Sequence, residues 1–260
     1  MIKIGVIGAG GRMGQKILSL LKSDKNVKIC SAIDAPNSNL IGQKVFADTD
    51  LVYSSDLNSA ICDVDIFIDF TTPVATMKNL EIIRQHKKAV VIGTTGFTDE
   101  QIDFIKQTAK EIPVVFSPNM SIGVNVFFKV LADTAKLLKD YDTEIVELHH
   151  NKKKDSPSGT AVKIAEIITE NTGRKKEDWV YGREGIVGER ENKEIGIHAV
   201  RLGDIVGEHT VYFCGNNERL ELAHRAHSRD NFASGAVRAA MWLFGKQAGL
   251  YDMFDVLGLK

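Results

Sequence analysis

The chain opens with Ile2-Lys3-Ile4-Gly5-Val6-Ile7-Gly8-Ala9-Gly10-Gly11-Arg12-Met13-Gly14. Its first six residues form an apolar run that predicts a buried β-strand, and the run leads directly into glycines. Beyond them the apolar positions recur with the period of an α-helix, at Met13, Ile17, Leu18 and Leu21. A strand, a glycine turn and a helix in this order bring backbone N–H groups and a helix N-terminus close to an anion such as a pyrophosphate.

The glycine spacing departs from the strict G-x-G-x-x-G pattern, because Met13 stands in the place of the third glycine. The related spacing Gly8-x-x-Gly11-x-x-Gly14 keeps the tight turn and the close backbone approach. Asp34 follows about twenty residues after Gly14, where a carboxylate binds the ribose hydroxyls of a dinucleotide. The alternative is a tight turn that binds no ligand.

The surroundings of Asp34 bear on the choice of cofactor. Its carboxylate suits the two ribose hydroxyls of NAD and would repel a 2′-phosphate. The neighbours Ala35 and Pro36 offer no arginine for such a phosphate. We therefore expect a nicotinamide cofactor, with NADH preferred and NADPH possible. Charge for a 2′-phosphate could still come from elsewhere, at Lys3, Arg12 or Lys44.

Strand-like and helix-like segments alternate through the first 120 residues. Further strands are expected at Val27–Ile33, Asp65–Phe70, Ala89–Ile92 and Pro113–Phe116. Polar turns follow them, and the sequence Thr98-Asp99-Glu100-Gln101 has the form of a capping box that opens a helix. This alternation predicts an α/β fold with a Rossmann-like, doubly wound parallel sheet, which binds ligands at the carboxyl ends of its strands.

The pattern then changes to strands with few helices between them. After a helix at Ile122–Leu138, strands are expected at Asp142–Leu148, Ile195–Leu202, Gly207–Cys214 and Arg219–Ala223, with one helix from Ser158 to Glu170. This predicts a second α+β domain carrying a mixed sheet. We expect Thr172–Lys193 to be a mobile or partner-contacting loop. A last helix, Asn231–Lys246, is expected to return to the first domain.

The domain prediction follows from this change of pattern. Residues 1–120 plus 230–260 are expected to form the dinucleotide-binding domain. Residues 121–229 are expected to form the substrate-binding and oligomerisation domain. The active site would then lie in the cleft between them, with closure over the substrate.

The segment Glu-Leu-His-His-Asn-Lys-Lys-Lys-Asp-Ser-Pro-Ser-Gly-Thr-Ala, residues 147–161, has the richest chemistry in the chain. His149 and His150 can exchange protons near neutral pH, and Glu147 could orient one ring. A partly buried lysine crowded by other cations, Lys153 above all, would become a better acid. The alternative is a solvated basic loop in front of an ordinary helix.

The end of this segment predicts a helix start that binds an anion. Pro157 suits the first helical turn, and Ser158 or Asp155 can cap it. The N–H groups of Ser158, Gly159 and Thr160 would then be free to point at an anion. Together with the cationic turn, this predicts a site for a small polyanion on which protons are moved.

Composition narrows the classes of function. The 260 residues have a net charge of −1, 43% hydrophobic and 26% charged residues, which is typical of a soluble globular protein. Neither nucleic-acid nor membrane binding is expected from this balance. No run reaches the roughly 18 apolar residues of a membrane span, and no signal peptide is apparent, so we expect a cytoplasmic protein. Cys30, Cys62 and Cys214 fit no metal spacing or disulfide set and are expected in apolar surroundings.

These motifs resemble the dihydrodipicolinate reductase (4-hydroxy-tetrahydrodipicolinate reductase) family of lysine and diaminopimelate biosynthesis. The resemblance spans nearly the whole chain, and residues 147–161 are its most specific part. Its further motifs are Gly8–Gly14, Asp69-Phe70-Thr71, Gly93-Thr94-Thr95-Gly96, Asn119 with Gly123-Val124-Asn125, Arg183-Glu184-Gly185, Gly188-Glu189-Arg190, residues 201–209 and residues 231–243. Ser156 departs from the usual alanine, and Ala35 from the arginine of NADPH-using members.

The resemblance implies an oxidoreductase that transfers a hydride from a nicotinamide to ring C4 of a cyclic, unsaturated dicarboxylate, giving tetrahydrodipicolinate. It assigns proton donation or acceptance to His149 and proton donation to Lys153, and it implies a homotetramer built through the second domain. The implied substrate contacts are His150, Lys153, Ser158, Gly159 and Thr160. The implied cofactor contacts are Gly8, Ala9, Gly10, Gly11, Arg12, Met13, Asp34, Gly93, Thr94, Thr95, Ser117, Pro118, Asn119 and Met120. No metal is implied.

Two other functions fit parts of the sequence. Another two-domain NAD(P)-dependent reductase could act on a semialdehyde or an imino acid, although no cysteine is poised in a strand–helix turn for a thioester. A regulator that senses NADH without catalysis is the second, but it would not need His149 and Lys153. The remaining histidines, His86, His198, His209, His224 and His227, are expected to be structural or on the surface.

Overall fold

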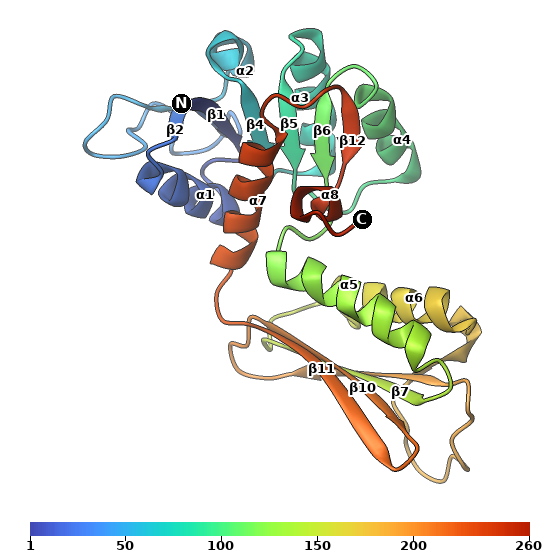
Figure 1. Cartoon of the computed structure of the whole chain (residues 1–260). Coiled ribbons are helices and arrows are strands. Elements are labelled where there is room, and N and C mark those ends of the chain that lie inside the picture. Colours follow the sequence, from blue (N-terminus) through green and yellow to red (C-terminus); the bar gives the residue numbers. More distant parts are fainter. The chain divides into compact units, whose positions relative to one another are not determined.

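The computed structural model describes residues 1–260, which divide into two compact units (Figure 1). The first unit comprises Met1–Ile122 and Asp230–Lys260, and the second comprises Gly123–Arg229. None of the helices combines the length and hydropathy that a membrane crossing requires.

A seven-stranded sheet organises the first unit, in the order β3-β2-β1-β4-β5-β6-β12. Each strand is parallel to its neighbours. The strands are β1 (Ile2–Ile7), β2 (Val27–Ile33), β3 (Tyr53–Ser54), β4 (Ile66–Asp69), β5 (Ala89–Ile92), β6 (Pro113–Phe116) and β12 (Gly249–Tyr251). The order reverses between β1 and β4, and this is where doubly wound sheets bind their ligands. The Rossmann-like prediction is confirmed.

Helices cover both faces of this sheet because side chains alternate along its central strands. Val90 and Val114 pack in a cluster with α2, α3 and α4, whereas Val91 and Val115 pack in a cluster with α1, α7 and α8. The helices are α1 (Arg12–Ser23), α2 (Leu57–Ala60), α3 (Pro73–Gln85), α4 (Asp99–Thr108), α7 (Asp230–Leu243) and α8 (Met253–Leu257), with a short 3₁₀ turn η1 (Ile61–Asp63). The predicted capping box of α4 is present, with Thr98 as N-cap.

A five-stranded mixed sheet organises the second unit, in the order β11-β10-β7-β9-β8. β10 is antiparallel to β11 and β7, while β7, β9 and β8 are mutually parallel. The strands are β7 (Asp142–His149), β8 (Trp179–Tyr181), β9 (Ile195–Arg201), β10 (Gly207–Gly215) and β11 (Glu218–Ala226). The helices α5 (Ile122–Leu137) and α6 (Gly159–Thr172) lie on one face of this sheet (Figure 1). The predicted mixed sheet is confirmed.

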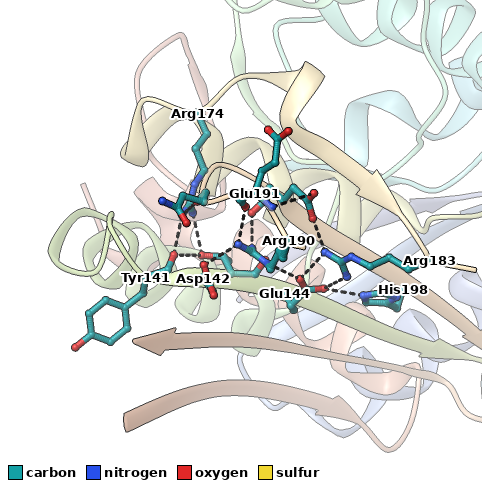
Figure 2. A network of polar contacts seen from close by, with 11 residues as sticks. Tyr141, Asp142, Glu144, Arg174, Arg183, Arg190, Glu191 and His198 are labelled. Carbon is teal, nitrogen blue, oxygen red and sulfur yellow. Dashed lines mark hydrogen bonds and ion pairs between the residues drawn. The ribbon is translucent and has the colours of Figure 1, made fainter. Parts of the chain in front are cut away.

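The expected loop at Thr172–Lys193 is only partly a loop. It contains the 3₁₀ turn η2 (Lys176–Asp178) and the strand β8, which pairs with β9. Beyond β8, two arginines fasten the segment to Glu144 on β7 (Figure 2). Arg183 donates to Glu144 at 3.0 and 3.2 Å, and Arg190 donates to it at 3.2 Å. The sequence showed the charge of this segment but not the carboxylate that anchors it.

The cysteine environment also differs from the expectation. All three cysteines are free, but Cys62 and Cys214 are exposed and only Cys30 is partly buried. Burial raises the pKa of the Cys30 thiol.

Candidate active site

The glycine turn connects β1 to α1 in the first unit, and its shape requires glycine. Gly8 has a φ of +78°, and a Cβ on Gly14 would lie 2.1 Å from the Gly8 carbonyl oxygen. A Cβ on Gly10 would lie 2.3 Å from Oδ2 of Asp34. Gly11 is the N-cap of α1 and supplies no side-chain cap. The N-terminus of α1 therefore keeps its N–H groups for an anion, and Asp34 lies directly beside the turn.

The turns after β4, β5 and β6 form the rest of this carboxyl edge. A hollow of about 320 Å³ lies there. It is lined by Met13, Phe70, Gly93, Pro118, Asn119, Met120 and Phe232. A Cβ on Gly93 would lie 2.1 Å from Cζ of Phe70, so glycine is needed for the ring to occupy its place. The glycine turn at the start of α1 suits phosphates, and the mostly apolar lining of the hollow suits a flat ring, as a dinucleotide requires.

In the second unit, Glu147 and His149 project from the same face of β7 because they are two positions apart. Nδ1 of His149 hydrogen-bonds to Oε2 of Glu147. The other ring nitrogen, Nε2, faces Gly207 on β10, where a Cβ would lie only 2.9 Å away. The side chain of His149 is 12% exposed. The carboxylate fixes the ring through Nδ1, which leaves Nε2 as the nitrogen that can exchange a proton.

Glu147 is fully buried and fully paired. Arg201 on β9 donates to its two oxygens at 2.8 and 2.9 Å, and the Ser158 backbone N–H donates at 3.0 Å. Burial raises the pKa of Glu147, but the hydrogen bonds from His149, Arg201 and Ser158 outweigh it and bring the pKa down to about 2. Glu147 is therefore an anion that joins the His149 ring to the start of α6.

His209 on β10 completes this cluster. It is 4% exposed, and its Nε2 lies 3.1 Å from the Ser158 hydroxyl. Its ring packs edge-on against His149, with ring centroids 5.3 Å apart. Burial, followed by the charge of His149, lowers the pKa of His209 to about 3. A neutral ring at this place supports the Ser158 hydroxyl without adding a charge.

The start of α6 differs from the prediction in two respects. The helix begins at Gly159 with Ser158 as N-cap, so Pro157 precedes the helix and does not occupy its first turn. The Ser158 hydroxyl accepts from the Ala161 N–H at 3.2 Å, but the Ser158 N–H is bound to Glu147 and is not free for a ligand. Gly159 and Thr160 occupy the first two positions of the helix.

Lys153 is paired with a carboxylate, Asp155, which the sequence did not predict. Its Nζ donates to both carboxyl oxygens of Asp155, at 2.9 and 2.8 Å, and its side chain is 18% exposed. The hydrogen bond from Lys153 lowers the pKa of Asp155. Asp155 therefore holds the lysine and does not cap the helix.

His150 lies beside Arg229. Nη2 of Arg229 is 3.4 Å from Nε2 of His150. Nδ1 of His150 is buried without a hydrogen-bond partner. An arginine donor at Nε2 favours the tautomer with its proton on Nδ1.

The sequence of the chain matches two family models. Residues 2–120 match "Dihydrodipicolinate reductase, N-terminus", and residues 123–257 match "Dihydrodipicolinate reductase, C-terminus". The chain belongs to the dihydrodipicolinate reductase family. It is 54% identical to the 4-hydroxy-tetrahydrodipicolinate reductase of Trichlorobacter lovleyi and 51% identical to that of Citrifermentans bemidjiense, each over 100% of both chains.

Solved structures agree with this membership. A dipicolinate-bound dihydrodipicolinate reductase from Paenisporosarcina sp. TG-14 superposes with a TM-score of 0.81 at 27% identity, covering 98% of both chains. A probable dehydrogenase from Thermotoga maritima superposes with a TM-score of 0.65 at 12% identity, over 99% of this chain and 93% of its own, and shares the fold alone. As a member of the reductase family with a Rossmann-like sheet, the chain uses a nicotinamide dinucleotide.

The structure distributes the predicted site residues over both units. All predicted cofactor residues lie in the first unit, after β1, β2, β5 and β6, and His149, His150, Lys153 and the start of α6 lie in the second. The sequence missed the parts played by Arg201 and His209. Both residues lie in the family motif at residues 201–209, but their partners come from neighbouring strands and depend on the register between β7, β9 and β10.

Proposed function

We propose that the chain reduces 4-hydroxy-tetrahydrodipicolinate to tetrahydrodipicolinate with a nicotinamide cofactor. The observation that carries the proposal is the buried pair of Glu147 and His149, which the Ser158 N–H joins to the start of α6. Membership of the reductase family supports the reaction. Dinucleotide binding is assigned to residues 1–120 plus 230–260, and substrate binding and oligomerisation to residues 121–229.

The protein's part in the reaction is to bind two carboxylates and to deliver a proton. When bound, the reduced cofactor supplies the hydride for ring C4. His149 is the proton donor or acceptor, working through Nε2, because Glu147 holds Nδ1 and stabilises the charged imidazolium. Lys153 is a proton donor, and its ammonium group also attracts the dianionic substrate. His150, Gly159 and Thr160 bind a ring carboxylate at the start of α6, and Ser158, whose N–H is bound to Glu147, holds that start in place as its N-cap.

The proposed cofactor preference rests on Asp34, which directly follows β2. Gly8, Ala9, Gly10, Gly11, Arg12 and Met13 surround the phosphates, and Gly93, Thr94, Thr95 and residues 117–120 surround the nicotinamide end. Asp34 receives the ribose hydroxyls and disfavours a 2′-phosphate, so NADH is the preferred cofactor and NADPH is possible.

The second unit leaves one face of its sheet without helices, and we assign a homotetramer to contacts made through this unit.

The test is an assay of NADH and NADPH oxidation with freshly prepared 4-hydroxy-tetrahydrodipicolinate. Substrate-dependent oxidation, with a higher kcat/KM for NADH, is the expected result. Folded protein that binds NADH but oxidises neither cofactor would contradict the proposal.

A variant of Lys153 tests which residue donates the proton to the substrate. Lys153→Ala should lower kcat at least about a hundredfold if Lys153 donates the proton, since acid–base groups typically contribute 10² to 10⁴. A rise in KM at unchanged kcat would instead make Lys153 an anchor for a substrate carboxylate and leave the proton to His149.

A further inference from the structure

Asp69 is a buried carboxylate that the proposed proton transfer does not use. It ends β4 in the first unit and is 1% exposed. Its Oδ1 accepts from Thr71 Oγ1 at 2.6 Å, from Thr76 Oγ1 at 3.2 Å and from Thr94 Oγ1 at 3.3 Å. Its Oδ2 accepts from Asn79 Nδ2 at 2.9 Å. All four partners are neutral.

The Asp69 cluster ties two turns together. Thr71 follows β4 and Thr94 follows β5, and the Thr71 N–H also donates to Thr94 Oγ1 at 2.9 Å. The residues next to this cluster in sequence, Phe70 and Gly93, line the 320 Å³ hollow. Asp69 therefore lies directly behind the wall of the hollow that we assign to the nicotinamide end of the cofactor.

A carboxylate with no cation among its partners is costly to bury. Burial raises the pKa of Asp69, and the hydrogen bonds from Thr71, Asn79, Thr76 and Thr94 act against burial. The Asn79 amide donates to Oδ2 and three threonine hydroxyls surround Oδ1, and this many hydrogen-bond donors favours the ionised carboxylate. A positive charge arriving in the adjacent hollow would relieve the cost of this burial.

Such a charge arises in the reaction. Loss of a hydride, which carries two electrons to substrate C4, converts the neutral nicotinamide of NADH into the cationic ring of NAD⁺. We propose that Asp69 is a positioning residue that also makes the bound cofactor a stronger hydride donor, because its negative charge favours the oxidised ring over the reduced one. The inference rests on the proposed function only in placing the nicotinamide in this hollow.

The experiment compares the affinities of the full-length protein for NAD⁺ and NADH by calorimetry, without substrate. In Asp69→Asn, the ratio Kd(NAD⁺)/Kd(NADH) should rise roughly tenfold, the effect of a unit charge within about 10 Å at an effective dielectric constant of about 20. A structural role alone would change both affinities by the same factor. A ratio within twofold of the wild-type value overturns the inference.

Thr76→Val is the matched control. It removes one donor from the same buried cluster but leaves the carboxylate, so any weakening of the two affinities should be equal and the ratio should not change. A tenfold rise of the ratio in Thr76→Val would overturn the inference, because packing and not charge would then set the ratio.

A double variant covers the case in which Asp69→Asn does not fold. Asp69→Asn combined with Asn79→Asp exchanges amide and carboxylate, keeps a hydrogen bond between them and moves the charge onto α3. Its ratio should rise more than twofold, and an unchanged ratio overturns the inference. Wild-type protein that binds neither nucleotide would overturn the proposed function as well, whereas normal binding with unchanged ratios overturns this inference alone.

Discussion

Glu144 and Glu147 offer a comparison of two carboxylates on one strand. They lie on β7 at an odd separation, so they face opposite sides of the sheet. Each binds a histidine and at least one arginine, and hydrogen bonds outweigh burial to bring each pKa down to about 2. Only Glu147 touches a residue that we assign to proton transfer. The histidine that binds Glu144 is His198 on β9, to which we assign no part in proton transfer.

This difference predicts unequal effects on catalysis. Glu147→Gln should lower kcat at least about tenfold, because His149 loses the anion that holds Nδ1 and stabilises the imidazolium. Glu144→Gln removes the same charge from the same strand and should leave kcat within about twofold of the wild-type value. Steady-state rates, measured where circular dichroism shows both variants folded, test the prediction. Equal losses in the two variants would contradict it.

At the residue scale, the sequence predicted a contact between side chains of one strand and missed the contacts between side chains of neighbouring strands. The spacing of Glu147 and His149 was enough to suggest that one orients the other. His209 is the register partner of Glu147 and so packs against the ring of His149, and Arg201 is the register partner of His149 and so binds Glu147. Nothing in a single sequence sets such a register when turns of many residues separate the strands.

At the scale of elements, the N-caps of α6 and α4 allow a test of whether the start of α6 binds the substrate. Ser158 caps α6 and Thr98 caps α4, and each accepts a backbone N–H from the first turn. Ser158→Ala and Thr98→Ala should each lower the free energy of unfolding by about 1 kcal/mol. Only Ser158→Ala should also raise KM for the substrate, at least about threefold, because the start of α6 is assigned to a substrate carboxylate. Thermal melts and steady-state kinetics measure the two effects, and a raised KM in Thr98→Ala would refute the assignment.

Elements with a long periodic pattern were predicted well, and short ones were missed. β1, β2, β5 and β6 have the predicted bounds, because each is a mostly apolar run between polar turns. β3, β8 and β12 have only two or three residues, too few to show any alternation. They form at sheet edges, where pairing with an existing strand supplies the backbone hydrogen bonds that the local sequence does not specify.

At the scale of the whole molecule, acid should affect the two units differently. Glu144 and Glu147 lie in the second unit, and each has a folded-state pKa of about 2 against an ordinary value of 4.5. Their stabilisation is present above pH 4.5 and is lost as the pH falls toward 2, up to about 3 kcal/mol each. Asp69 lies in the first unit and has the opposite sign. Its raised pKa means that protonation in acid relieves a cost of burial.

The second unit should therefore unfold at a higher pH than the first when the protein is acidified. The chain has one tryptophan for each unit, Trp179 on β8 and Trp242 on α7. Fluorescence of Trp242→Phe reports the second unit, and that of Trp179→Phe reports the first. Titration from pH 6 to pH 2 should give the higher midpoint for Trp179. Glu147→Gln, which lacks the stabilisation of the ionised carboxylate at every pH, should raise the midpoint of the second unit and move the two midpoints further apart. Coincident transitions in the wild-type protein would mean that the units unfold as one and that the buried carboxylates of β7 do not decide the order.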